Sequence, residues 1–547
     1  MLNNKIKGIC SLISSVFAQL IIGNCFTFGN FVYYYKSYLH YKNIDNISIL
    51  NLLFVAPTSA ACLNILPIVT GYLDKILGIR ILTIMSALCS LTSQLIIYFY
   101  TKYYLMIIAY IFYGFAGSIT YLPTLRNCWK YYPKKKGIIS GILFSSCGLS
   151  TFLFTSIGDY IINPKAEAKK DSLYSEEVAM RYTKYLKFYI ICIIVLGILS
   201  SILSFPYKEE KNALKEVEDD KDDKIIIDEN KENNNDEKNE DENVNMINDQ
   251  KDNRYSVKSN KEEENNKNNN INLEKDEELT IKECLFSIQF LQCFSIVGCT
   301  LLFGFLLTNT YRPFGLSMKL NELGIQSLSK VFTLLNTFSR IVWGLIYDKF
   351  GFKYPYMFVC INQITCSSLI YFSAKNIYTY FLCCCFGVLS FSGHVILFPN
   401  LIAKKFGVTN SVTLMGVCGL LGGSTCLLGP VLTSSIIKEN SDYLKTYLIA
   451  GSTTIVSLIL IFIVKIEKMK KSDLLKKENA TEKIKEDTEN NTSSETKENT
   501  ENNTIEERVK DNDKDNITKN NTENNVEKEE NITENIEDNK EENLIDN

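Results

Sequence analysis

The chain has 547 residues, a net charge of -4 at pH 7 and 46% hydrophobic residues. Two long stretches, residues 8–206 and 280–467, are dense in Leu, Ile, Phe, Tyr and Cys, whereas the rest is almost entirely polar. No basic stripe with interleaved aromatic residues appears, so nucleic-acid binding has no support. The 17 cysteines follow no disulfide or zinc spacing, so we expect neither a metal site nor a cofactor.

Twelve apolar stretches follow one another in chain order, each near the roughly 20 residues that cross a bilayer. Six precede the first polar segment, at about 10–33, 48–72, 79–100, 104–126, 137–162 and 185–206. Six follow it, at about 283–309, 326–347, 354–374, 377–402, 411–437 and 443–465. The sequence therefore predicts an all-α membrane protein with two six-helix domains, residues 1–206 and 280–467.

The two polar segments, residues 207–279 and 468–547, contain no Gly or Pro and consist mainly of Asn, Lys, Glu and Asp. With so few apolar side chains they cannot bury enough surface to offset the entropy of ordering. We expect the first to be a disordered loop between the two domains and the second a disordered tail.

Basic residues near the span ends set the expected orientation. If the helices alternate, one side receives Lys5, Lys7, Lys75, Arg80, Arg126, Lys130, Lys134, Lys135, Lys136, Lys349, Lys353, Lys404, Lys405, Lys468, Lys470 and Lys471. The opposite connections carry fewer, except residues 163–184, where basic and acidic residues are mixed. We therefore expect both termini, the loop and the tail on the cytoplasmic side of a multi-pass membrane protein, in the plasma membrane or an organelle membrane.

Glycine- and proline-marked patterns occur once in each domain, in the same order and at nearly the same separation. They are Gly117-x5-Pro123-x-Leu125 and Gly393-x5-Pro399-x-Leu401, Gly141-x6-Gly148 and Gly416-x6-Gly423, and Gly71…Gly78…Arg80 and Gly344…Gly351…Lys353. Such repetition indicates two parallel halves that rock against each other, as in secondary transporters.

The connection between the eighth and ninth spans carries a family signature. It reads Gly344-x3-Asp348-Lys349-x-Gly351-x-Lys353 and resembles the signature loop of the major facilitator superfamily. This resemblance implies that superfamily's twelve-helix fold and a transporter, not an enzyme.

The earlier copy of this signature, which begins at Gly71, has its acidic residue one position early. In both copies a charge cluster that breaks when the cytoplasmic side opens would act as a latch. The expected gating residues are Asp74, Lys75, Arg80, Asp348, Lys349 and Lys353. The alternative is that these charges only satisfy the positive-inside rule.

A second resemblance is to the monocarboxylate transporters and the oxalate/formate antiporters. It rests on Tyr131-Tyr132-Pro133 with the following Lys134-Lys135-Lys136-Gly137, and on Asn336-x3-Arg340-x3-Gly344. In the carboxylate carriers the arginine at this place binds the substrate carboxylate, so the resemblance implies that role for Arg340.

The sequence departs from these carriers at the other charged positions. Asn336 stands where the monocarboxylate carriers have an acid, and Asn30 falls near the place of their first-span lysine. The basic residue that the oxalate antiporters carry in span eleven is absent from residues 411–437. With a single cationic anchor left, a monoanion is favoured over a dianion, and we expect Asn336 and Asn30 to contribute to its binding.

The position of Arg340 supports the same role. It lies eight residues before Asp348, so about 12 Å of helix separates it from the connecting loop. An ionised side chain at that depth is costly and normally faces a cavity or a partner, and a guanidinium matches a carboxylate in a bidentate way. The alternative is a structural arginine paired with a loop acid or with helix-end carbonyls.

His394, in the tenth span, is the candidate for proton coupling near neutral pH. A hydrogen-bonded packing histidine is the alternative. Asp159, near the outer end of the fifth span, is a second candidate of the same kind.

These patterns predict a monomeric secondary transporter that moves small organic anions through the lipid bilayer by alternating access, with monocarboxylates as the favoured substrates. No Gly-x4-Gly-Lys-Ser/Thr loop is present, which argues against an ATP-driven pump. Two other functions stay open: a carrier of neutral or cationic solutes such as amino acids or drugs, and a membrane sensor that transports nothing.

Overall fold

The computed structural model describes residues 3–44, 47–167, 169–170, 173–208 and 279–471. The chain divides into two compact units, Met1–Met469 and Lys470–Asn547, and every helix given below belongs to the first. The segments expected to be disordered lie almost wholly outside the described residues, so their state and the domain boundaries they define stay predictions.

In the part of the chain before residue 209, one helix follows another with only short connections. They are α1 (Asn4–Gly23), the 3-10 turn η1 (Asn24–Thr27), α2 (Phe28–Tyr41), α3 (Ile49–Leu53), α4 (Val55–Ile65), α5 (Pro67–Phe99), α6 (Tyr103–Tyr131), α7 (Lys136–Ile162) and α8 (Glu176–Leu203). The helices after residue 278 are α11 (Ile281–Leu285), α12 (Ile288–Ser317), α13 (Glu322–Phe350), α14 (Lys353–Ser373), α15 (Ile377–Phe406), α16 (Ser411–Ile436) and α17 (Asn440–Ile463).

Within the described residues, these elements group into twelve rods that correspond to the twelve predicted spans. The first rod is α1, η1 and α2 together, and the second runs through α3 and α4 into α5. Inside α5 the backbone at Gly78 leaves the helical conformation (φ 74°, ψ 162°), which separates the second rod from the third. Gly351, which occupies the same place in the later copy of the pattern, also has a positive φ, 72°. Both positions need glycine, because other residues reach this region only with strain.

Eight helices in the described part of the chain are long and apolar enough to cross a membrane, counting α1 to α2 as one. Shorter apolar stretches lie at Asn51–Ile65, within α3 and α4, and at Ser411–Leu427, the first part of α16. Helices α13 and α14 are outside both groups because polar side chains interrupt them, among them Arg340 in α13 and Gln363 in α14. Rods of this kind cross a membrane where the polar side chains face protein or a cavity.

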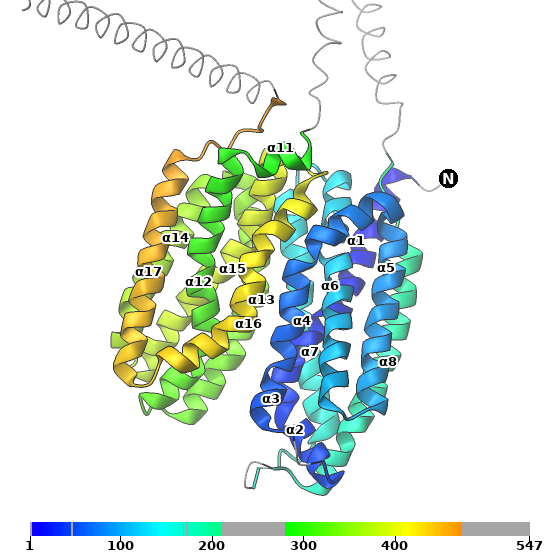
Figure 1. Ribbon diagram of the computed structural model, residues 1–547, viewed down its shortest axis with the longest axis vertical. Coiled ribbons are helices and arrows are strands. Elements are labelled where there is room, and N and C mark those ends of the chain that lie inside the picture. Colours follow the sequence, from blue (N-terminus) through cyan, green and yellow to red (C-terminus); the bar gives the residue numbers. More distant parts are fainter. Residues whose placement is uncertain (1–2, 45–46, 168, 171–172, 209–278, 472–547) are drawn as a thin grey trace, which may run out of the picture. The chain divides into compact units, whose positions relative to one another are not determined.

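Figure 1 colours the helices before residue 209 blue to cyan and those after residue 278 green to orange. Six of the repeated glycines lie against the other of these two halves: Gly71, Gly141, Gly148, Gly344, Gly416 and Gly423. On α7, a Cβ added at Gly141 would come within 2.7 Å of the Arg340 carbonyl oxygen of α13. On α16, a Cβ at Gly416 would come closer than 3 Å to the backbone of Ile68 in α5. The pattern Gly-x6-Gly is therefore repeated because the same close helix contact is built twice, as small residues permit in membranes.

We expect Gly416→Ala to destabilise the protein, because the atoms nearest the new methyl group are backbone atoms that cannot turn aside. Overpacking of this kind costs about 1–3 kcal/mol, so a clear fall in the thermal transition of the detergent-solubilised carrier should follow. Gly29→Ala is the matched control, since a Cβ there meets nothing within 4 Å. Equal transitions for the two variants would contradict this account of the crossing.

Candidate functional site

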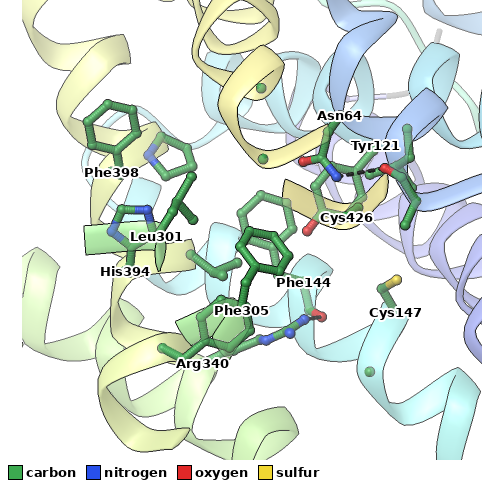
Figure 2. Close-up of a pocket in the computed structure, with 18 of the residues that line it drawn as sticks. Asn64, Tyr121, Phe144, Cys147, Leu301, Phe305, Arg340, His394, Phe398 and Cys426 are labelled. Atoms are coloured by element: carbon green, nitrogen blue, oxygen red, sulfur yellow. Dashed lines mark hydrogen bonds between the residues drawn. The ribbon is translucent and has the colours of Figure 1, made fainter. Parts of the chain in front are cut away.

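A cavity of about 430 Å³ lies between helices of the two halves of the sequence (Figure 2). The first half contributes residues of η1, α4, α5, α6 and α7, and the second half contributes residues of α12, α13, α15 and α16. Much of the lining is aromatic: Phe26, Tyr121, Phe144, Phe305, Phe391 and Phe398. A mostly apolar pocket with a few converging polar groups is typical of a small-molecule site.

Arg340 lines this cavity from α13. Its Nη1 donates a hydrogen bond of 2.6 Å to the backbone carbonyl of Phe144 on α7, and its Nη2 lies 3.4 Å from the side-chain oxygen of Asn336. Its Nε is buried and has no hydrogen-bond partner. Among the described residues that line the cavity there is no Asp, Glu or Lys, so Arg340 supplies the only full charge there and no acid neutralises it.

The two predicted partners of Arg340 lie in different places. Asn336, one helical turn before Arg340, also lines the cavity. Asn30 does not line it: its side chain is exposed and donates to Thr155 at 3.2 Å. Asn64, from α4, is instead the asparagine that the first half contributes to the lining.

His394 lines the same cavity from α15 and is almost wholly buried. Its Nδ1 lies 2.5 Å from the hydroxyl of Tyr356 and 3.2 Å from that of Thr300. Its ring also stacks on Phe398, with centroids 5.7 Å apart. Because each hydroxyl can donate or accept, the cluster satisfies Nδ1 in either imidazole tautomer. His394 is thus hydrogen bonded and well packed, and it also lies beside the cavity. Both the packing interpretation and the proton-coupling interpretation therefore stay open.

Asp159 is separate from this group. It is exposed near the end of α7 and accepts a hydrogen bond of 3.3 Å from the hydroxyl of Tyr34. It is not among the lining residues of the cavity. The two candidates for proton coupling are therefore not brought together.

Asp348 links the two halves at the end of the helices where residues 71–80 and 344–353 lie, which we term the motif end. Its two carboxylate oxygens accept hydrogen bonds from the backbone N–H groups of Gly137, at 2.7 Å, and Ile138, at 2.9 Å. These are among the first N–H groups of α7, which have no partner within their own helix. The negative charge also meets the positive end of the α7 dipole.

The earlier copy of the signature makes a different link. Asp74 forms an ion pair of 2.7 Å with Arg126 at the end of α6. Arg126 in turn donates to the carbonyl of Thr409 at 3.3 Å, and Lys75 reaches the side chain of Asn410 at 3.4 Å. Since one residue is about 100° of helix rotation, the early position of Asp74 turns its carboxylate toward Arg126 instead of the start of α16.

The remaining predicted gating residues take no recorded part in these links. Arg80 and Lys349 are exposed. Lys349 lies over the ring of its neighbour Phe350, and Lys353 lies 5.9 Å from the ring of Phe462 within the same half.

Sequence reasoning missed the role of Arg126 and one further contact between the halves. The amide of Asn400 on α15 donates to the hydroxyl of Ser140 on α7 at 3.0 Å. Asn400 directly follows Pro399 of the repeated pattern, and this position in the sequence could have identified Asn400 as a candidate. The hydrogen bonds recorded between the halves run from Asp348 and Lys75 at the motif end to Arg340 and Ser145 beside the cavity.

The comparison with known families decides the identity of this architecture. The family described as Major Facilitator Superfamily matches residues 20–430. The chain belongs to the Major Facilitator Superfamily. Its members are transporters that bind small molecules within the membrane, so this chain is an integral multi-pass membrane protein. The predicted fold class is confirmed for the described residues.

Two similar proteins agree with this assignment. Monocarboxylate transporter 12 of Mus musculus is 25% identical over 183 residues, which is 32% of this chain and 36% of that relative. The matched region thus spans little more than a third of the relative's length. The solved structure of the MFS proton:xylose symporter XylE bound to 6-bromo-6-deoxy-D-glucose aligns with a TM-score of 0.57 and 11% identity. It covers 85% of this chain and 98% of its own, and shows the shared fold.

Proposed function

We propose that this protein is a secondary active carrier of small organic monoanions, with a carboxylate bound at Arg340. The observation that carries the proposal is the charge of the cavity: one arginine and, among the described lining residues, no carboxylate. A cation held without a counterion within the membrane is costly. A carboxylate that enters the cavity offsets that cost, so an anion should bind more tightly than a neutral solute or a cation.

The contacts of Arg340 favour a carboxylate over a neutral acceptor. The bond to the Phe144 carbonyl fixes one arm of the guanidinium, so less side-chain freedom is lost when a ligand binds. The bond from Nη2 to Asn336 is long, at 3.4 Å, and Nη1 has a second hydrogen besides the one given to Phe144. Donors therefore remain for two parallel charge-assisted hydrogen bonds.

Transport would proceed by alternating access. The hydrogen bonds recorded between the halves lie at the motif end and beside the cavity, as expected of a carrier closed at that end. We take the motif end, both termini, the loop and the tail to be cytoplasmic, and the carrier to act as a monomer in the plasma membrane. Asp348 and its bonds to α7 would hold the closed state.

Cationic solutes are the less favoured alternative, because an ammonium group would find no carboxylate among the described lining residues. The similarity over 36% of monocarboxylate transporter 12 supports the anion assignment. A sensor that transports nothing would show no solute flux, which distinguishes it from a carrier.

The test is uptake by proteoliposomes containing the purified full-length carrier. We expect uptake of labelled acids to exceed that of the matching neutral amides and of methylammonium, because only the acids carry a charge opposite to that of Arg340. Empty liposomes give the background. Faster uptake of amides or of methylammonium would contradict anion transport, and no flux of any solute would favour the sensor.

We further propose that His394 couples transport to protons. We expect His394→Asn to abolish the acceleration of acid uptake by an inward proton gradient, because asparagine can hydrogen bond but does not titrate. Exchange of labelled for unlabelled acid without a gradient should continue. Asp159→Asn is the comparison variant, since Asp159 lies outside the cavity. Undiminished acceleration in His394→Asn would exclude the histidine from coupling.

A further inference from the structure

The size of the cavity narrows the class of acid that fits, and this inference rests on the proposed function. A volume of about 430 Å³ lies in the range of small-molecule sites that bury whole drug-sized ligands. Acetate and lactate have only a few non-hydrogen atoms and would leave most of this space to water. We propose that the preferred substrate is a monocarboxylate with an aromatic ring, of the arylacetate type, and that the ring occupies the aromatic part of the cavity.

Four of the six aromatic residues in the lining form two pairs, one from each half of the sequence. Tyr121 of α6 stacks on Phe144 of α7, with centroids 4.6 Å apart and planes at 22°. Phe305 of α12 meets Phe391 of α15 edge to face, with centroids 5.8 Å apart and planes at 65°. In the first pair Tyr121 is the more exposed, and in the second both rings are partly exposed, so both pairs present ring surface to a ligand.

The position of Arg340 gives the substrate a direction. Its guanidinium is bonded to the carbonyl of Phe144, so a carboxylate held by Arg340 lies beside the Tyr121–Phe144 pair. The remainder of the molecule then extends into a lining that offers Phe305, Phe391 and Leu301, with no second full charge among its described residues. A second carboxylate or an ammonium group on the substrate would be buried there without a partner, which is unfavourable.

Ring burial supplies binding energy that a short acid cannot. An aromatic ring packed against aromatic walls gains from the area removed from water and from edge-to-face or offset contacts. A C2 or C3 acid makes the same bonds to Arg340 but leaves the Phe305–Phe391 surface uncovered. We therefore expect the Michaelis constant of phenylacetate to be at least about tenfold lower than that of acetate.

The experiment measures uptake of labelled phenylacetate, acetate and neutral phenylacetamide by proteoliposomes of the full chain and its variants. Phe391→Ala should raise the Michaelis constant of phenylacetate about fivefold to twentyfold and change that of acetate by less than about twofold. Phe372→Ala, at a ring on α14 that is 55% exposed and outside the cavity, is the matched control. Val395→Phe, which fills lining space, should weaken phenylacetate uptake while sparing acetate.

The outcomes separate this inference from the proposed function. If acetate has the lower Michaelis constant, or if Phe391→Ala and Val395→Phe affect both acids equally, the aromatic specificity is wrong while anion transport stands. If phenylacetamide is carried as well as phenylacetate, the proposed function itself is wrong. Should Phe391→Ala fail to fold or to reconstitute, Phe391→Leu keeps more of the side-chain volume and carries the same expectation with a smaller change.

Discussion

Replacing Arg340 by alanine is expected to reduce uptake of an organic monoanion by tenfold to a hundredfold or more at low substrate concentration. A charge-assisted hydrogen bond contributes about 1.5–3 kcal/mol, which is roughly tenfold to more than a hundredfold in affinity. Arg340 offers the only full charge among the described lining residues, so no neighbouring cation can take its place. Initial uptake rates at matched amounts of reconstituted protein measure the effect.

Lysine should restore only part of the activity. An ammonium group keeps the charge but not the planar fork, so it cannot hold the Phe144 carbonyl and a bidentate carboxylate together. Arg312→Ala is the matched control, because Arg312 is exposed on α12 and lies outside the cavity lining. Near-normal uptake by the alanine variant would remove Arg340 from the site and with it the main ground for preferring anions over neutral solutes.

The fold could be predicted from the sequence because its backbone conformations and close helix contacts each depend on a single residue type at a single position. Gly78 and Gly351 need a positive φ, and Gly141 and Gly416 lie at close helix crossings. Each demand leaves glycine at a fixed spacing, and the repeat makes the spacing visible. The depth of Arg340 in its helix is equally local, since it follows from counting residues to Asp348.

The site was only partly predictable, because spacing does not tell which face of an apolar helix meets a cavity. Asn30 and Asn64 are both polar residues in apolar spans, yet only Asn64 lines the cavity. Phe305 and Phe391 are indistinguishable in the sequence from phenylalanines that face outward. The pairing of Asp74 with Arg126 also depends on a one-residue shift whose effect appears only when the helices are packed.

The second large effect is expected at Asp348, where alanine should weaken closure of the motif end. The carboxylate accepts bonds from the N–H groups of Gly137 and Ile138, at 2.7 and 2.9 Å. Alanine removes both and leaves the start of α7 without an acceptor. At about 1.5–3 kcal/mol for each charge-assisted bond, the ratio of closed to open molecules should fall by about a hundredfold or more.

Hydrogen exchange of the peptide containing Gly137 and Ile138 reports the loss of these two bonds, and the turnover number reports the change in closure. We expect faster exchange in Asp348→Ala together with slower turnover, since a carrier that seldom closes completes fewer cycles. Asp348→Asn keeps one acceptor oxygen without the charge and should fall between wild type and alanine. Lys349→Ala, a change at an exposed neighbour, should leave exchange unaltered. A raised Michaelis constant with unchanged turnover would mean that Asp348 acts on the substrate and not on the state of the carrier.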